Sequence, residues 1–213
     1  MLAFFFMPTL TLAIYVGFDL PVEMLRTSGS QIPYKEEIFL GLGIVIFLLI
    51  LRRSIRRWMG MRIVNQVKRF KWNKEVSRDR VKRVMTYQIL EALIMSWVAA
   101  GLYVLTPLAI VPAIAFGIGV LDNLIFAIVG RNKKFRVGVS SKAVIVADRE
   151  VTLLYFTGLR KISTHQQTLY FDYIKGLQLR FPTNCIDPAE RDEFNEALEA
   201  QIDRDRVFFS KKG

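Results

Sequence analysis

The chain has 213 residues, of which 52% are hydrophobic, and it nevertheless carries a formal net charge of +11. These two properties coexist because apolar and charged residues occupy different parts of the chain. Four stretches are almost free of charge, at residues 1–20, 38–51, 87–105 and 108–129. This segregation excludes an ordinary soluble domain and indicates an integral membrane protein.

The lengths of these stretches predict four transmembrane helices within residues 1–130. A helix needs about 20 apolar residues to cross a hydrocarbon core about 30 Å thick, and three of the stretches reach that length. The uncharged run 38–51 is shorter, and it can cross only if Lys35 at one end and Arg52 and Arg53 at the other extend toward the headgroups. We read the first stretch as a retained helix, because it lacks the basic n-region of a signal peptide.

The charge excess predicts the orientation of the helices. Residues 52–85 contain 13 Lys or Arg and two acids, while the other 17 bases and 17 acids of the chain balance. Short loops rich in Lys and Arg stay on the cytoplasmic side. We therefore expect a multi-pass protein of the plasma (inner) membrane, with this loop and both termini in the cytoplasm.

The basic loop 52–85 also predicts a binding surface. Apolar residues from Ile55 to Phe70 recur at spacings of three and four, which predicts a basic amphipathic helix. Such a helix suits the anionic cytoplasmic leaflet. We favour a lipid surface, or a plain topology signal without a ligand, over a protein partner, and a protein partner over nucleic acid. The candidate lipid-binding or partner-binding residues are Arg52, Arg53, Arg56, Arg57, Arg62, Lys68, Arg69, Lys71 and Lys74.

Three polar residues lie inside the predicted spans, where a charged side chain costs at least a few kcal/mol. Glu91 is in the third span, and Asp122 and Asn123 are in the fourth, at a similar depth from the cytoplasmic end. They could form a shared proton or cation site or a contact to a partner subunit. The alternative, which we favour, is that both carboxylates reach toward the membrane interface.

Small residues in the second and fourth stretches predict close helix packing. Gly41 and Gly43 form one pair, and Gly117 and Gly119 form the other. Small residues let helix backbones approach one another in lipid. We therefore expect a homo-oligomer or a larger protein complex.

Residues 131–213 predict a small cytoplasmic α+β domain. Five segments are rich in β-branched and aromatic residues, which favours antiparallel strands joined by short turns. These segments are residues 135–139, 143–147, 151–156, 168–171 and 174–181.

A helix is predicted after the strands. Asp187 is a good N-cap, Pro188 suits the first helical position and Glu190 completes a capping box. The helix should run to about residue 203, with an apolar stripe against the sheet. That stripe consists of Phe194, Leu198 and Ile202.

Several meandering strands closed by one C-terminal helix resemble the pleckstrin-homology-like domains of bacterial membrane proteins. The resemblance covers residues 135–203, rests on the order of the elements, and has five strands where that family has seven. It implies a module for binding or assembly rather than a catalyst.

The sequence offers little for catalysis. It holds one histidine, His165, in a predicted turn, and one cysteine, Cys185, in the loop before the last helix. The usual catalytic, nucleotide-binding and metal-binding motifs do not occur. We expect no enzymatic activity, no cofactor and no metal site.

The sequence is compatible with three functions. The leading hypothesis is a non-catalytic membrane subunit that anchors, oligomerises, and recruits or senses a cytoplasmic partner or anionic lipid. The second is a small ion or proton channel or transporter subunit that uses Glu91 and Asp122. The third is the membrane sensor or effector of a stress or phage-defence system.

Overall fold

The computed structural model describes residues 2–22, 27–202 and 207–210. The chain forms two compact units, each built from two separate segments. The helical unit comprises Met1–Ile55 and Tyr87–Ala127, and the β unit comprises Arg56–Thr86 and Ile128–Gly213. Much of the predicted basic loop therefore belongs to the same unit as the C-terminal strands.

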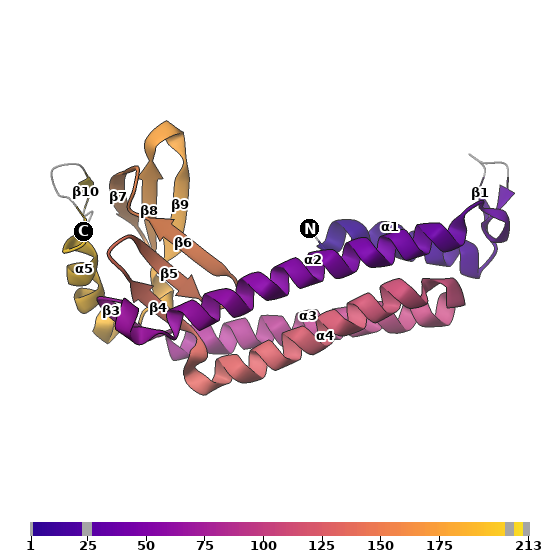
Figure 1. The fold of residues 1–213 in the computed structure, drawn as a ribbon, viewed down its shortest axis with the longest axis horizontal. Helices are drawn as coiled ribbons and strands as arrows, with labels where there is room; N and C mark the ends of the chain where they lie inside the picture. The colour runs from indigo at the N-terminus through magenta and orange to yellow at the C-terminus, as the bar shows by residue number, and fades with distance from the viewer. Residues whose placement is uncertain (1, 23–26, 203–206, 211–213) are drawn as a thin grey trace. The chain divides into compact units, whose positions relative to one another are not determined.

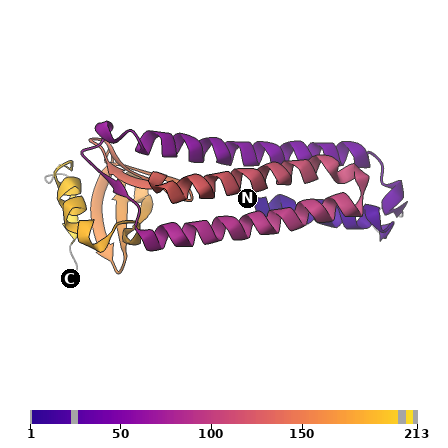
Figure 2. The same ribbon diagram turned by 90° about the horizontal axis from the view of Figure 1, so that it is seen from below.

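Four helices supply the helical unit: α1 (Leu2–Gly17), α2 (Lys35–Val64), α3 (Arg78–Leu105) and α4 (Ile110–Val129). In both ribbon views α2, α3 and α4 run alongside one another (Figures 1 and 2). The short 3₁₀ turn Pro107–Ala109 joins α3 to α4, with the Thr106 side chain capping its first turn.

Three helical segments in the described residues are long and apolar enough to cross a membrane: Lys35–Val64, Arg78–Leu105 and Pro107–Lys134. The fourth predicted span is not confirmed. Helix α1 has 16 residues, which gives a length of about 24 Å, short of the roughly 30 Å of a hydrocarbon core. The second predicted span, by contrast, lies in a helix of 30 residues.

Helix α1 ends where the backbone turns left-handed. Asp19 has a φ of 50°, and Leu20 N–H donates to the Tyr15 carbonyl at 3.0 Å. Two short strands follow, β1 (Pro21–Val22) and β2 (Thr27–Ser28), which pair antiparallel. The Asp19 carboxylate accepts a hydrogen bond from Ser30 N–H at 2.7 Å, and bonds from Ser30 and Ser28 lower the pKa of Asp19.

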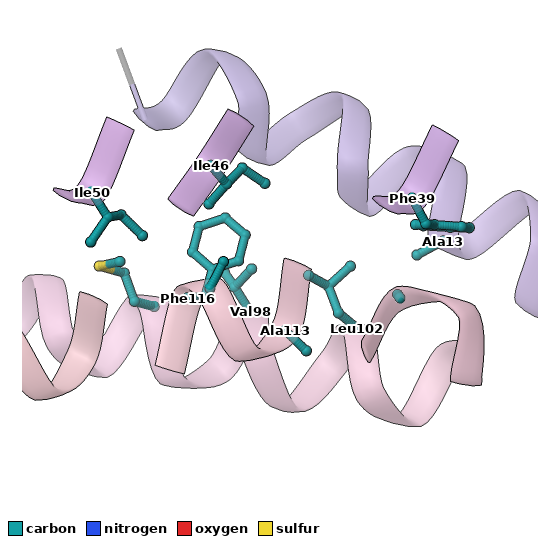
Figure 3. Packing of buried hydrophobic residues seen from close by; sticks show 11 residues of the cluster. Ala13, Phe39, Ile46, Ile50, Val98, Leu102, Ala113 and Phe116 are labelled. Carbon is teal, nitrogen blue, oxygen red and sulfur yellow. The ribbon is translucent and has the colours of Figure 1, made fainter. Parts of the chain in front are cut away.

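The apolar core of the helical unit lies between α2, α3 and α4 and extends to Ala13 of α1 (Figure 3). Phe116 of α4 occupies its centre, with Ile46 of α2 and Val98 of α3 beside it. A Cβ added to Gly43 would lie 2.9 Å from the Pro112 backbone nitrogen. This glycine therefore lets α2 and α4 approach closely within one chain.

The other three glycines of the two predicted pairs differ in their surroundings. A Cβ on Gly119 would collide with Met95 and Ile50, whereas Gly41 and Gly117 have no other atom within 4 Å of such a Cβ. The close packing expected of small residues is thus found inside the chain at two positions. The two open positions leave flat places on the outer surface of α2 and α4.

The described residues of the β unit form two four-stranded sheets. The first has the order β3 (Trp72–Glu75), β4 (Arg136–Val139), β5 (Ala143–Ala147) and β6 (Val151–Tyr155), all antiparallel. The second has the order β10 (Phe208–Ser210), β7 (Leu159–His165), β8 (Thr168–Tyr173) and β9 (Gln178–Pro182), with β10 parallel to β7.

Successive side chains along a strand point to opposite faces of the sheet, and in the first sheet the valines share the buried face. Val137 pairs with Val146 and Val139 pairs with Val144, and all four side chains are buried. Trp72 of β3 pairs with Val139 and continues the same face. A segment between two long helices thus supplies an edge strand of this sheet.

The five predicted strands are all found, and the predicted basic amphipathic helix is found in part, because the helix continues from Ile55 only to Val64. Helix α2 extends to Val64, a 3₁₀ turn covers Val67–Arg69, and β3 begins at Trp72. Strand β3 lies just beyond the predicted helical pattern, which ends at Phe70, and it forms because it pairs with β4 and buries Trp72.

The last helix starts as predicted but differs in its first turn. Asp187 accepts a hydrogen bond from Ala189 N–H at 3.2 Å and caps a 3₁₀ turn, Pro188–Glu190. Helix α5 (Arg191–Glu199) follows. The predicted apolar stripe of Phe194, Leu198 and Ile202 is buried.

Phe194 of α5 joins the two sheets through an aromatic cluster. Its ring stacks on Phe181 of β9 with centroids 5.2 Å apart. It meets Trp72 of β3 edge to face at 5.3 Å. The C-terminal helix, the last strand of the meander and the connection between α2 and α3 therefore share one core.

Candidate functional site

The polar residues predicted in the spans, Glu91, Asp122 and Asn123, lie in one layer of the helical unit together with two residues of α2, Arg53 and Ser54. We call these five residues the polar layer. Both terminal nitrogens of Arg53 donate to the Glu91 carboxylate, the second at 2.8 Å. Ser54 donates to Asp122 at 2.7 Å. The layer therefore ties α2 to both α3 and α4.

Periodicity along α2 explains why one helix makes both contacts. Arg53 and Ser54 are adjacent and point about 100° apart around the helix, so one reaches Glu91 on α3 and the other reaches Asp122 on α4. Asn123 is buried and its amide donates to the Met95 sulfur at 3.6 Å. The bidentate guanidinium pair is the strongest of these contacts.

This geometry gives Glu91 and Asp122 different neighbours. Glu91 is held by a guanidinium and Asp122 by a hydroxyl group. The arrangement can fix the positions of three helices in a low-dielectric medium, because each polar group is costly to separate from its partner there.

A residue that sequence reasoning missed lies one turn from Glu91 on the same face of α3. The side chain of Gln88 is fully buried, and neither its nitrogen nor its oxygen has a hydrogen-bond partner among the described residues. A buried amide in this state calls for an explanation such as an ordered water. Gln88 could have been identified from the sequence by its spacing of three residues from Glu91, which places both side chains on one face of a helix.

The nine basic candidates separate into two groups. Arg53 is paired with Glu91, Arg57 is buried, and Lys74 is paired within the β unit. The other six are exposed to solvent: Arg52, Arg56, Arg62, Lys68, Arg69 and Lys71.

Lys74 faces α5 and the turn before it. Its ammonium lies 3.3 Å from Glu190 and 3.4 Å from Glu193. The hydrogen bond and charge of Glu190, followed by those of Glu193, raise the pKa of Lys74. This lysine therefore holds β3 to the C-terminal helix.

A second ion pair that the sequence did not reveal lies in the β unit. Arg80, in the first turns of α3, pairs with Asp148 at 2.9 Å, and the Asp148 side chain is buried. Ser77 donates through its hydroxyl to the Asn184 carbonyl at 2.6 Å, and its N–H donates to the Cys185 carbonyl. These contacts fix the start of α3 to the β unit.

Cys185 and His165 do not form a reactive pair. Cys185 is buried, and burial, reinforced by the charge of Asp148, raises the pKa of its thiol to about 12. His165 is exposed at the end of β7. Among residues 2–22, 27–202 and 207–210, no three His, Cys, Asp or Glu side chains gather in a way that could hold a metal ion.

Comparison with known proteins gives no relative: no protein-family model, curated protein or solved structure matches the chain.

Proposed function

We propose that the chain is a non-catalytic integral membrane subunit. The observation that carries this proposal is the apolar outer surface of α2, α3 and α4. Trp97 is 79% exposed and Val104 is 81% exposed, and similar residues continue along α4. Exposed apolar surface is unfavourable in water at about 25 cal/mol per Å², so lipid is the medium that suits these helices.

In this proposal the protein lies in the plasma membrane with the basic segment and both termini in the cytoplasm. The concentration of bases between Arg52 and Arg83 supports that orientation. Helix α1 would then be the first of four crossings and would begin in the cytoplasm. An even number of crossings returns the C-terminus to the cytoplasm.

The β unit is the recruiting or sensing part of this subunit. Strands β3 to β9, followed by α5, form two sheets and a C-terminal helix, an element order that supports the resemblance to pleckstrin-homology-like domains. Its occupant would be a cytoplasmic partner or an anionic lipid.

The proposal is tested by purifying the full chain in a mild detergent and measuring its mass together with that of any companion. We expect a homo-oligomer or a complex. Gly117→Ile should weaken the assembly without disturbing the chain's own packing, because that position is open within the chain. Gly43→Ile is the matched control that should disturb the chain's own packing. A bare monomer without companions would contradict the proposal.

A transport function is the second candidate, and the unsatisfied amide of Gln88 favours it. A buried amide of this kind beside the polar layer suits a hydrated interior. Proton or ion flux into liposomes should then fall in Glu91→Gln and Asp122→Asn variants. Equal flux in wild type and variants would exclude this function.

A sensor or effector function is the third candidate. The observation in its favour is that β3, an edge strand of the β unit, is covalently placed between α2 and α3. A ligand that changes the position of β3 would act directly on both helices. The test is to measure the yield of crosslinks between α2 and α3 in cells with and without a stress signal. A yield that is the same under every stress would argue against this function.

A further inference from the structure

The second half of α2 exposes arginine and apolar residues on a single face. At about 100° per residue, six side chains fall within an arc of about 120°. These residues, which we call the α2 stripe, are Arg52, Ile55, Arg56, Met59, Arg62 and Ile63. Ile55 is 48% exposed, Met59 57% and Ile63 40%.

The opposite face of the same helix fixes this rotation. Arg57, Met61 and Val64 are buried, and Gly60 packs against Val151 so closely that a Cβ would collide with it. The helix cannot turn its stripe inward without breaking that packing. The stripe is therefore a permanent outer surface.

The position of the stripe along α2 corresponds to a membrane interface. The uncharged run of α2 ends at Leu51, and the whole helix of 30 residues is about 45 Å long, against about 30 Å for a hydrocarbon core. The stripe follows the apolar run directly and spans about 16 Å. If the apolar run lies in the hydrocarbon, Arg52, Ile55 and Arg56 lie at headgroup depth, because one headgroup layer is about 5–8 Å thick, and the long side chain of Arg62 can reach back toward it.

We propose that the α2 stripe binds the phosphate groups of anionic phospholipids. This proposal rests on the proposed membrane function. Guanidinium groups form paired hydrogen bonds with phosphate oxygens, and three arginines complement the negative headgroups. Ile55 and Met59 lie between them along the helix, nearest to the apolar run, where they can contact the upper parts of acyl chains. A soluble phosphate ion has no apolar part that could contact these side chains.

The structure also separates this site from the other bases of the region. Arg57 is buried, and Arg53 and Lys74 are paired with carboxylates of the protein itself. Lys68, Arg69 and Lys71 follow α2 and lie outside the helical arc. The three stripe arginines are therefore the bases that can act together with apolar neighbours on one helix face.

The test measures which lipids remain bound to the full-length protein. The purified chain is incubated with equal amounts of phosphatidylglycerol and phosphatidylcholine in detergent, and bound lipids are counted by native mass spectrometry. The triple variant Arg52→Gln, Arg56→Gln, Arg62→Gln is compared with wild type. The control, Lys82→Gln, Arg131→Gln, Lys134→Gln, removes the same charge from exposed positions outside the stripe.

We expect the preference for phosphatidylglycerol to fall by more than tenfold in the stripe variant, since each arginine contributes about fivefold, or about 1 kcal/mol. The control should lose less than threefold. Ile55→Asn with Met59→Asn should also weaken lipid binding, and excess inorganic phosphate should not displace the lipid.

Three results would overturn the proposal. An unchanged preference for phosphatidylglycerol in the stripe variant would show that the stripe is not the binding site. An equal loss in both triple variants would show that the preference depends on overall charge. Displacement of lipid by inorganic phosphate would assign the site to a soluble anion. A chain that stays soluble without detergent and retains neither lipid would instead contradict the membrane function itself.

Discussion

The helical unit and the β unit distribute polarity in opposite ways. In the helical unit Trp97 and Val104 face outward, while Arg53, Glu91 and Gln88 lie toward the interior. In the β unit apolar side chains such as Val144 and Leu154 are buried. One chain thus contains a unit suited to an apolar surrounding and a unit suited to water.

This difference shows how each unit is held together. The β unit gains stability by removing apolar surface from water, as soluble domains do. Helices in lipid gain little from that effect, so close packing and internal polar contacts contribute more. Substitutions of apolar and polar residues should therefore have different consequences in the two units.

The largest expected effect is in the aromatic cluster of the β unit. Phe194→Ala removes a ring that contacts both Phe181 and Trp72. We expect a loss of about 4 kcal/mol in the free energy of unfolding of the β unit, measured by chemical denaturation with Trp fluorescence. Phe208→Ala, at an exposed position, is the control and should change little. Equal losses would contradict the assigned core.

The helical unit should respond most to a change in the polar layer. Glu91→Leu removes the carboxylate to which Arg53 donates, and we expect a loss on the order of 3 kcal/mol. Adding Arg53→Met should recover much of that loss, because both charges are then gone. Thermal unfolding in detergent measures both variants, with Glu36→Gln at an exposed position as control. Failure of the double variant to recover would assign the pair another role.

A substitution of Gln88 should stabilise the helical unit, in contrast to the two preceding substitutions, which should destabilise their units. Because its buried amide has no partner among the described residues, Gln88→Leu should raise the free energy of unfolding by about 1 kcal/mol. Gln31→Leu, in the exposed connection before α2, should have no such effect. A fall in melting temperature for Gln88→Leu would show that the amide is satisfied by a bound water or a partner.

Sequence reasoning located the elements better than their lengths and partners. The three long helices, five strands and the stripe of α5 followed from local patterns. The run 38–51 gave too short a second helix, because charged residues such as Arg52 have good helix propensity and α2 continues through them.

The missed strands show what local patterns lack. Strand β7 carries Arg160, Lys161 and His165 among few apolar residues, and β3 is a short strand that directly follows a segment with a helical pattern. Both form because a neighbouring strand pairs with them. The same limit applies to the polar layer: Glu91 and Asp122 were identified, but their partners Arg53 and Ser54 depend on how three helices pack.

The β unit should lose stability at high pH through Cys185. Its thiol has a pKa of about 12 in the folded chain because it is buried, against about 8.5 for an exposed thiol. The stabilisation is complete below about pH 8.5 and is lost as the pH rises toward the folded value. Between pH 8 and pH 10.5 the melting temperature should fall further in wild type than in Cys185→Ala. Identical falls would contradict the burial of this thiol.

The smallest effect should come from the contact between β3 and α5. Lys74→Gln removes the ammonium shared by Glu190 and Glu193. Because these side chains are accessible to water, the pair is screened, and we expect a small fall in the melting temperature of the β unit at low salt that vanishes at about 1 M salt. Lys142→Gln, at an exposed position, should show no salt-dependent change. If the fall persisted at high salt, the Lys74 side chain would be acting through packing, as the aromatic cluster does, and β3 would be held to α5 by apolar contacts alone.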